Sequence, residues 1–134
     1  AAAELFIGQG IRTSLETNGP DLLTKEAVCL KASCGAGHLD SIFRGLARID
    51  LEKPAPSFEP IRERLEEMED RESLCTIFFS ADARPEFQQL LEKFRKEKRE
   101  FIWFCPVNRI IRPEINAGIR PYTRLIDVEE GGRL

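Results

Sequence analysis

Half of the cysteines and the only histidine of this chain fall within ten residues, Cys29 to His38. Cysteine thiolates and histidine nitrogens act as nucleophiles and as metal ligands, so this stretch is the first candidate for a chemical site. A helix starting after Cys34 would favour its thiolate, and His38 is the one imidazole that could act as its base. Cys34 and His38 are therefore candidate catalytic residues.

The spacing in this stretch matches no strong motif. Cys-x4-Cys-x3-His is not a zinc-finger spacing, and Cys75 and Cys105 lie in apolar runs where a free cysteine commonly serves as a small core residue. The third glycine of a dinucleotide fingerprint, and the arginine of a tyrosine-phosphatase loop, would both fall at position 40, which is Asp40. No metal site and no cofactor are predicted, and the alternative interpretation is a glycine loop with structural thiols.

A second candidate site follows two apolar runs of strand length. Ligands of open parallel sheets bind beyond the carboxyl ends of the strands. If the two runs are adjacent strands, their trailing polar residues converge on an anion, phosphate or carboxylate site, with Asp82 as a third catalytic candidate. The predicted anion-binding residues are Ser80, Asp82, Arg84, Asn108 and Arg109. In the alternative interpretation Asp82 only caps a helix and Arg109 only pairs with it.

Composition bounds the kind of protein. The 134 residues are 42% hydrophobic and 32% charged, which is ordinary for one globular domain. The longest apolar runs are far too short to span a bilayer, so a membrane role is not predicted. Four cysteines beside this much core material are typical of a cytoplasmic or other reducing intracellular compartment. The chain lacks an initiator methionine, and we expect it to be processed or cut from a longer protein.

The second half of the chain has clear periodicity. Ser57 is a plausible N-cap for the first helix, and Pro85 falls in the first turn of the second. The two intervening runs are apolar on both faces, which is typical of parallel strands covered on both sides. The predicted elements are a helix at 57–72, a strand at 74–79, a helix opening at Asp82 or Arg84, and a strand at 101–105.

The first half is more ambiguous. Strands are predicted at 5–15 and 27–32, and residues 39–51 fit both a strand and a helix. We favour a strand at 39–51 because the period-2 match runs longer and ends at a proline-rich breaker. The predicted fold is α/β, with α+β as the alternative. Three N-terminal antiparallel strands precede helix, strand, helix and strand in one mixed sheet.

The C-terminal region is predicted as an arm. The dipeptides Arg112-Pro113 and Arg120-Pro121 disfavour helix, and 122–128 reads as an edge strand. The segment is too apolar for a solvated tail, so it packs on its own domain or on a partner. The predicted organisation is a single mixed α/β domain at 1–109 and an extended arm at 110–134. The predicted partner-binding residues are Arg112, Arg120, Tyr122 and Arg124.

Charge is unevenly distributed along a chain of formal net charge −3. Residues 50–72 hold nine acidic and four basic residues, and residues 84–124 hold ten basic and five acidic residues. Opposed patches suit a protein partner or a homo-oligomer. The alternative interpretation is two amphipathic helices with solvated faces.

These features predict a non-catalytic binding or assembly domain of a longer or multi-subunit protein, associating through its charge patches and its arm. One alternative is a small enzyme acting on a phosphorylated or anionic small molecule. A further alternative is a nucleic-acid-binding module, with Trp103 and Tyr122 as stacking rings. The sequence pI of about 5.4 counts against nucleic acid.

Overall fold

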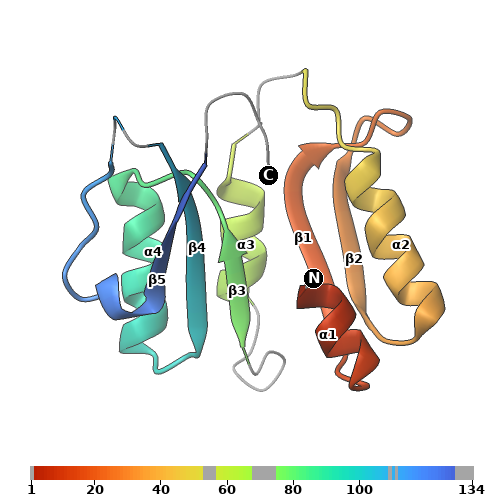
Figure 1. Ribbon diagram of the computed structural model, residues 1–134, viewed down its shortest axis with the longest axis horizontal. Helices are drawn as coiled ribbons and strands as arrows, with labels where there is room; N and C mark the ends of the chain where they lie inside the picture. The colour runs from red at the N-terminus through yellow and green to blue at the C-terminus, as the bar shows by residue number, and fades with distance from the viewer. Residues whose placement is uncertain (1, 53–56, 68–74, 109, 111, 129–134) are drawn as a thin grey trace. The chain divides into compact units, whose positions relative to one another are not determined.

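The computed structural model describes residues 2–52, 57–67, 75–108, 110 and 112–128. Over these residues the chain forms four α-helices, five β-strands in two sheets, and a 3-10 helix (Figure 1). The predicted mixed α/β class is confirmed. Contacts divide the chain into two compact units, Ala1–Glu67 and Met68–Leu134. No helix in the described parts is long and apolar enough to cross a membrane.

The N-terminal unit is built on an antiparallel hairpin. Its elements are α1 (Ala2–Gly8), β1 (Thr13–Pro20), β2 (Ala27–Ser33), α2 (Ala36–Ala47) and α3 (Glu59–Glu67). The strands β1 and β2 pair with Leu15 opposite Leu30 and Glu16 opposite Cys29. The helix α2 lies along β2, and α3 contacts β1 (Figure 1). Ser57 caps α3 as predicted, since its Oγ accepts a hydrogen bond from the Glu59 amide at 3.1 Å. Residues 68–72 of that predicted helix lie outside the described residues.

The prediction of a strand at 39–51 is wrong, because most of this segment belongs to α2. The helical alternative places Ile42 on the face that meets β2, and Ile42 is buried. The same face carries Gly45, where an added Cβ would lie 2.9 Å from Val28 Cγ1. By contrast, Leu51, at the end of the proposed strand face, is 90% exposed. Helical packing against β2 therefore outweighed the longer period-2 match of the local pattern.

The predicted strand at 5–15 is also wrong in its first half. Residues Ala2–Gly8 form α1, and the strand begins only at Thr13. Gly10, with φ of 75°, ends the helix, and the Ile11 amide donates back to the Phe6 carbonyl at 2.9 Å. Gly10 therefore marks the C-terminal end of a helix and does not interrupt a strand. Because α2 replaces the third predicted strand, the N-terminal sheet has two antiparallel strands and not three.

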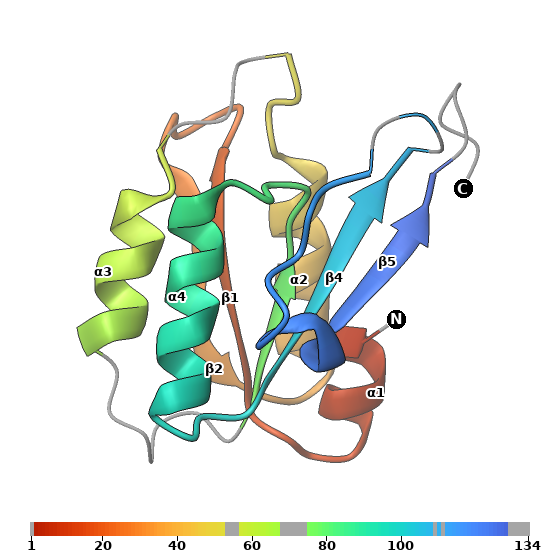
Figure 2. The same ribbon diagram turned by 90° about the vertical axis from the view of Figure 1, so that its left-hand side faces the viewer.

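The C-terminal unit contains a separate parallel sheet, so the predicted single mixed sheet is wrong for the described residues. Its elements are β3 (Thr76–Phe79), α4 (Pro85–Lys96), β4 (Phe101–Val107), η2 (Arg120–Tyr122) and β5 (Thr123–Asp127). The strand order is β3-β4-β5, and β4 pairs parallel with both neighbours. In Figure 2 the arrows of β4 and β5 point the same way. The predicted strand-helix-strand order and the predicted edge strand at 122–128 are confirmed.

An aromatic core joins α4 to this sheet. The Phe78 ring meets Phe87 and Phe94 edge-on at centroid distances of 5.7 and 5.5 Å, and Phe87 meets Trp103 at 5.1 Å. Trp103 is fully buried, and its indole N–H donates to the Ser80 carbonyl at 2.8 Å. The polar end of the largest core residue is therefore satisfied by the turn that follows β3.

A buried glutamine on α4 holds the segment after β4. Gln88 is 3% exposed, and its Nε2 donates to the carbonyls of Ala83 and Glu114 at 2.7 and 2.9 Å. Its Oε1 accepts from the Asn116 amide at 2.8 Å. Ile115 and Ile119 are buried in the same region. One side chain thus links the N-terminus of α4 to the connection that leads into β5.

Candidate functional site

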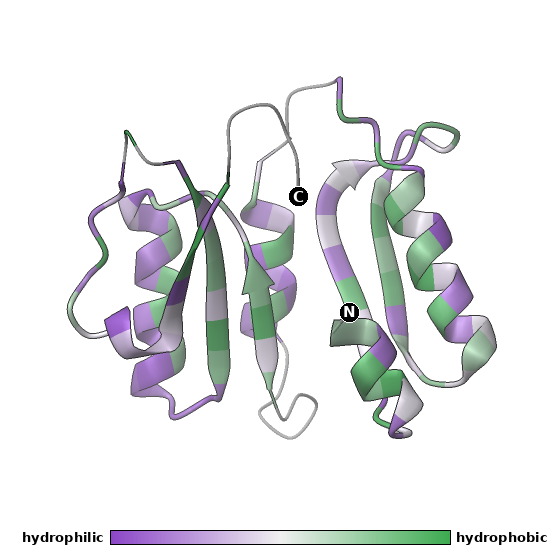
Figure 3. Cartoon of the chain, viewed as in Figure 1, coloured by the Kyte–Doolittle hydropathy of each residue, from purple (hydrophilic) through white to green (hydrophobic). Residues whose placement is uncertain are grey.

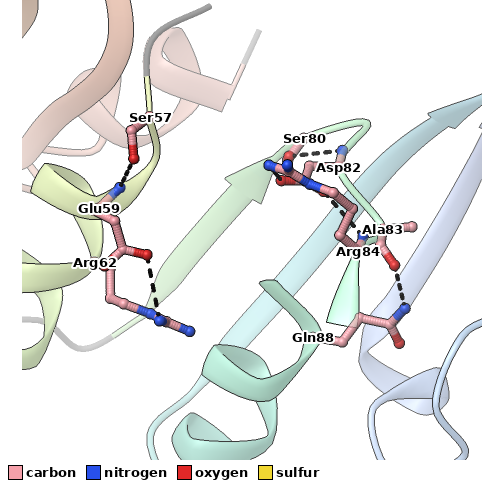
Figure 4. Close-up of polar contacts among 8 residues, drawn as sticks. All are labelled: Ser57, Glu59, Arg62, Ser80, Asp82, Ala83, Arg84 and Gln88. Carbon is pink, nitrogen blue, oxygen red and sulfur yellow. Dashed lines mark hydrogen bonds and ion pairs between the residues drawn. The ribbon is translucent and has the colours of Figure 1, made fainter. Parts of the chain in front are cut away.

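The strands β3 and β4 are adjacent and parallel, but β4 continues three residues beyond the end of β3, so their carboxyl ends are offset. Phe79 of β3 is in register with Phe104 of β4, and the Ser80 amide donates to the Phe104 carbonyl at 3.2 Å. The turn at residues 80–84 therefore begins beside β4, and Asn108 follows β4 itself. Of the predicted anion-binding residues, the structure brings Ser80, Asp82 and Arg84 together in one turn (Figure 4). Arg109 lies outside the described residues.

Asp82 and Arg84 form a two-pronged ion pair in this turn. The guanidinium donates from Nε to Oδ1 at 2.9 Å and from Nη2 to Oδ2 at 2.8 Å, and the Arg84 amide adds a third bond to Oδ1 at 3.0 Å. These bonds hold the pKa of Asp82 below its ordinary value and raise that of Arg84. A carboxylate stabilised in its charged form is poorly matched to acid–base catalysis near neutral pH. The pair instead shapes the turn that starts α4.

The other polar groups at this edge also serve their own turns. Ser80 Oγ accepts from the Asp82 amide at 3.1 Å, and Asn108 Oδ1 accepts from the Ile110 amide at 3.0 Å. Arg112 pairs with Asp127, at the end of β5, at 2.7 Å. No histidine follows any of these strands, so Ser80 lacks the base that a serine nucleophile needs.

The cysteine and histidine stretch forms the junction between β2 and α2. Cys34 is exposed and lies just before Gly35, the N-cap residue of α2. His38 Nε2 lies 2.6 Å from the Thr13 carbonyl, which attaches the first turn of α2 to β1. This contact gives His38 a structural partner. The residues that the structure describes contain no group of three His, Cys, Asp or Glu side chains able to hold a metal ion.

Cys29 has its own polar surroundings on β2. Arg64 of α3 places Nη2 3.3 Å from Cys29 Sγ and pairs through Nε with Glu16 of β1 at 2.7 Å. Partial burial raises the pKa of the Cys29 thiol despite the nearby arginine. The thiol is thus mostly protonated near neutral pH, and the cluster links α3 to the hairpin.

The predicted partner-binding residues brace their own segment. Arg120 Nη2 donates to the Ile115 carbonyl at 3.0 Å, and Arg124 Nη1 donates to the carbonyls of Pro121 and Thr123 at 3.0 and 3.1 Å. The Tyr122 ring stacks on Phe101 at 4.9 Å. Trp103 is buried and cannot stack on bases, whereas Tyr122 is 41% exposed and packs its ring on Phe101.

Sequence reasoning missed one surface, which we call the open face. We define it by five residues on the side of the parallel sheet opposite α4, toward the carboxyl ends of the strands: Phe79, Phe104, Pro106, Arg124 and Ile126. They alternate along the strands with Phe78 and Trp103, which pack on α4. The rings of Phe79 and Phe104 stack across the strands at 5.2 Å and 14°. The signal was present, because apolar residues occupy both faces of the two strands, and Figure 3 shows hydrophobic positions along each of them.

Comparison of the chain with protein-family models, with curated proteins and with solved structures finds no match. Function is therefore inferred from geometry alone.

Proposed function

We propose that this chain is a non-catalytic binding module and that the open face of its C-terminal unit binds an amphipathic helix of a protein partner. The observation that carries the proposal is Phe79, a large apolar side chain that is 68% exposed at the end of the edge strand β3, where it stacks on Phe104 of the central strand. Parallel sheets are normally covered on both faces, and α4 covers the opposite one. Covering one such ring contributes about 1.5–3 kcal/mol.

The composition of the face supports a helix with an acidic flank. Phe79, Phe104 and Ile126 supply apolar surface on three adjacent strands, and Ile126 is 41% exposed. Arg124 is in register with Phe104 and adds a cation on the same side. Arg124 also belongs to the partner-binding set predicted from sequence. A partner helix with a leucine stripe and flanking glutamates complements both features.

The enzyme alternative has weaker support. Its residues Asp82 and Arg84 already neutralise each other, and Ser80 has no base. The binding module is therefore the function that the geometry favours.

A pair of designed peptides tests the proposal. Both carry the same leucine stripe on a helix, one with flanking glutamates and one with flanking lysines, and binding is followed by fluorescence anisotropy. We expect tighter binding of the glutamate peptide. Phe79→Thr should weaken it about tenfold or more, and Arg124→Glu should reverse the preference between peptides. Phe43→Thr on α2, where Phe43 is 43% exposed, is the matched control and should bind normally.

Three results would count against this assignment. One is equal affinity of the two peptides for the wild-type chain. Another is sedimentation of the wild-type chain as a homodimer and of Phe79→Thr as a monomer, which would identify the open face as a homodimer interface. The third is tighter binding of a single-stranded oligothymidine that is lost in Phe79→Thr, which would favour nucleic acid.

A further inference from the structure

The N-terminal unit contains a groove that the binding-module proposal does not use. It lies between α2, β2 and the hairpin loop at 21–26, with a volume of about 310 Å³. This is near the lower limit for a small-molecule site. Val28 and Gly45 lie where α2 approaches β2 most closely, and the charged lining residues are Asp21, Glu26, Arg44 and Arg48.

The walls of the groove are held in place by backbone contacts. The Leu22 amide donates to the Arg48 carbonyl at 2.8 Å, and the Asp50 amide donates to the Pro20 carbonyl at 2.8 Å. These bonds tie the hairpin loop to the end of α2. Inside the loop, Asp21 Oδ1 accepts from the amides of Leu23 and Thr24 at 2.7 and 3.2 Å. The backbone of both walls is therefore held in place without a ligand.

The four charged groups differ in how they are engaged. Arg44 pairs with Asp40 one turn away, and the Asp21 carboxylate is held by its own loop. For the Arg48 guanidinium and the Glu26 carboxylate, no hydrogen bond or ion pair occurs with any described residue. The amide of Leu23 and, to a smaller extent, the nearby Arg48 charge lower the pKa of the Asp21 carboxyl. Arg48 and Glu26 thus line one groove with no hydrogen bond or ion pair between their side chains. Ala27, Val28 and Leu30 supply apolar lining between them along β2.

We infer that this groove binds a small zwitterion of the amino-acid type. The ligand carboxylate accepts hydrogen bonds from the Arg48 guanidinium, and the ligand ammonium donates to the Glu26 carboxylate. An aliphatic side chain lies on the apolar strand wall. Binding is non-covalent and requires no change in the fold, because the backbone contacts already hold both walls.

Three related probes distinguish this ligand class. L-Leucine carries both charges, N-acetyl-L-leucine lacks the ammonium, and L-leucinamide lacks the carboxylate. In amide NMR titrations of the full chain, we expect leucine to shift signals of residues 21–30 and 41–48. Each single-charge probe should bind at least about tenfold more weakly than leucine, because one charged hydrogen bond is lost.

Charge-matched variants complete the test. Arg48→Gln should lower the affinity for leucine about tenfold and leave the affinity for leucinamide unchanged. Glu26→Gln should also lower the affinity for leucine about tenfold, and it should leave the affinity for N-acetyl-leucine unchanged. The control variants Lys31→Gln and Glu4→Gln each remove one charge, positive and negative respectively, at a residue of the same unit that does not line the groove. Both should bind leucine with unchanged affinity. The amide spectrum of each variant reports whether it is folded. The inference fails if leucine shifts no groove signal, if all three probes bind equally, or if the controls weaken leucine as much as the groove variants.

Discussion

At the scale of single residues, the four cysteines occupy different environments. Cys105, in the middle strand of the parallel sheet, is fully buried, and burial raises its pKa. Partial burial of the thiol also raises the pKa of Cys29 and Cys75, although both residues are exposed. Cys34 is exposed at the junction before α2. The thiolate is the reactive form, so reactivity follows both access and thiolate fraction.

We therefore predict an order of alkylation. Native protein treated with iodoacetamide near neutral pH should be modified first at Cys34 and last at Cys105, as read by peptide mass spectrometry over time. In urea the four rates should converge, because unfolding removes the differences in burial. Modification of native Cys105 as fast as Cys34 would contradict the described packing of β4.

At the scale of elements, the packing of α2 on β2 depends on one missing side chain. A Cβ at Gly45 would approach Val28 Cγ1 to 2.9 Å, and Val28 is buried and β-branched, so it has little room to move. A Cβ at Gly37, near the start of the same helix, would meet nothing within 4 Å. Both glycines belong to α2, so they differ only in the tertiary contacts around them.

This difference predicts opposite responses to alanine. Gly45→Ala should lower the free energy of unfolding by about 1–3 kcal/mol, because overpacking outweighs the gain in helix propensity. Gly37→Ala should leave it unchanged or raise it by up to about 1 kcal/mol. Urea unfolding followed by circular dichroism measures both. Adding Val28→Ala should offset part of the Gly45→Ala loss, and purely additive effects would refute the proposed clash.

At the scale of the whole molecule, the chain consists of two compact units with separate sheets. The only tryptophan, Trp103, lies in the core of the C-terminal unit. Its fluorescence therefore reports on that core alone, whereas circular dichroism samples the helices of both units.

We predict blue-shifted Trp103 emission in the native protein, with little quenching by acrylamide. Unfolding in urea should shift the emission to the red and expose the indole to quencher. Gln88→Ala should move this transition to lower urea, because two carbonyls and one amide lose their buried partner. Its exposed neighbour gives the control, Gln89→Ala, which should have little effect. Strong quenching in the native state would contradict burial of Trp103.

The second half of the chain was largely predictable from sequence. The buried stripe of α4 repeats at helical spacing, Pro85 marks its first turn, and β3 and β4 are apolar on both faces. These are signals between neighbouring residues, and they agree with the tertiary packing. In the first half, residues 39–51 carried two periods at once. The longer period-2 match wrongly favoured a strand, because the choice depended on which face met β2.

The sequence alone determined the α/β class, the order of elements after residue 57 and the polar turn after β3. Tertiary structure decided the number of N-terminal strands and the separation into two sheets. It also decided that the Trp103 indole donates to the Ser80 carbonyl, and that Phe79 stacks on Phe104 from another strand. The physical reason is range. Periodicity and capping act over a few residues, whereas exposure, ion pairing and the covering of a face depend on segments that only folding brings together.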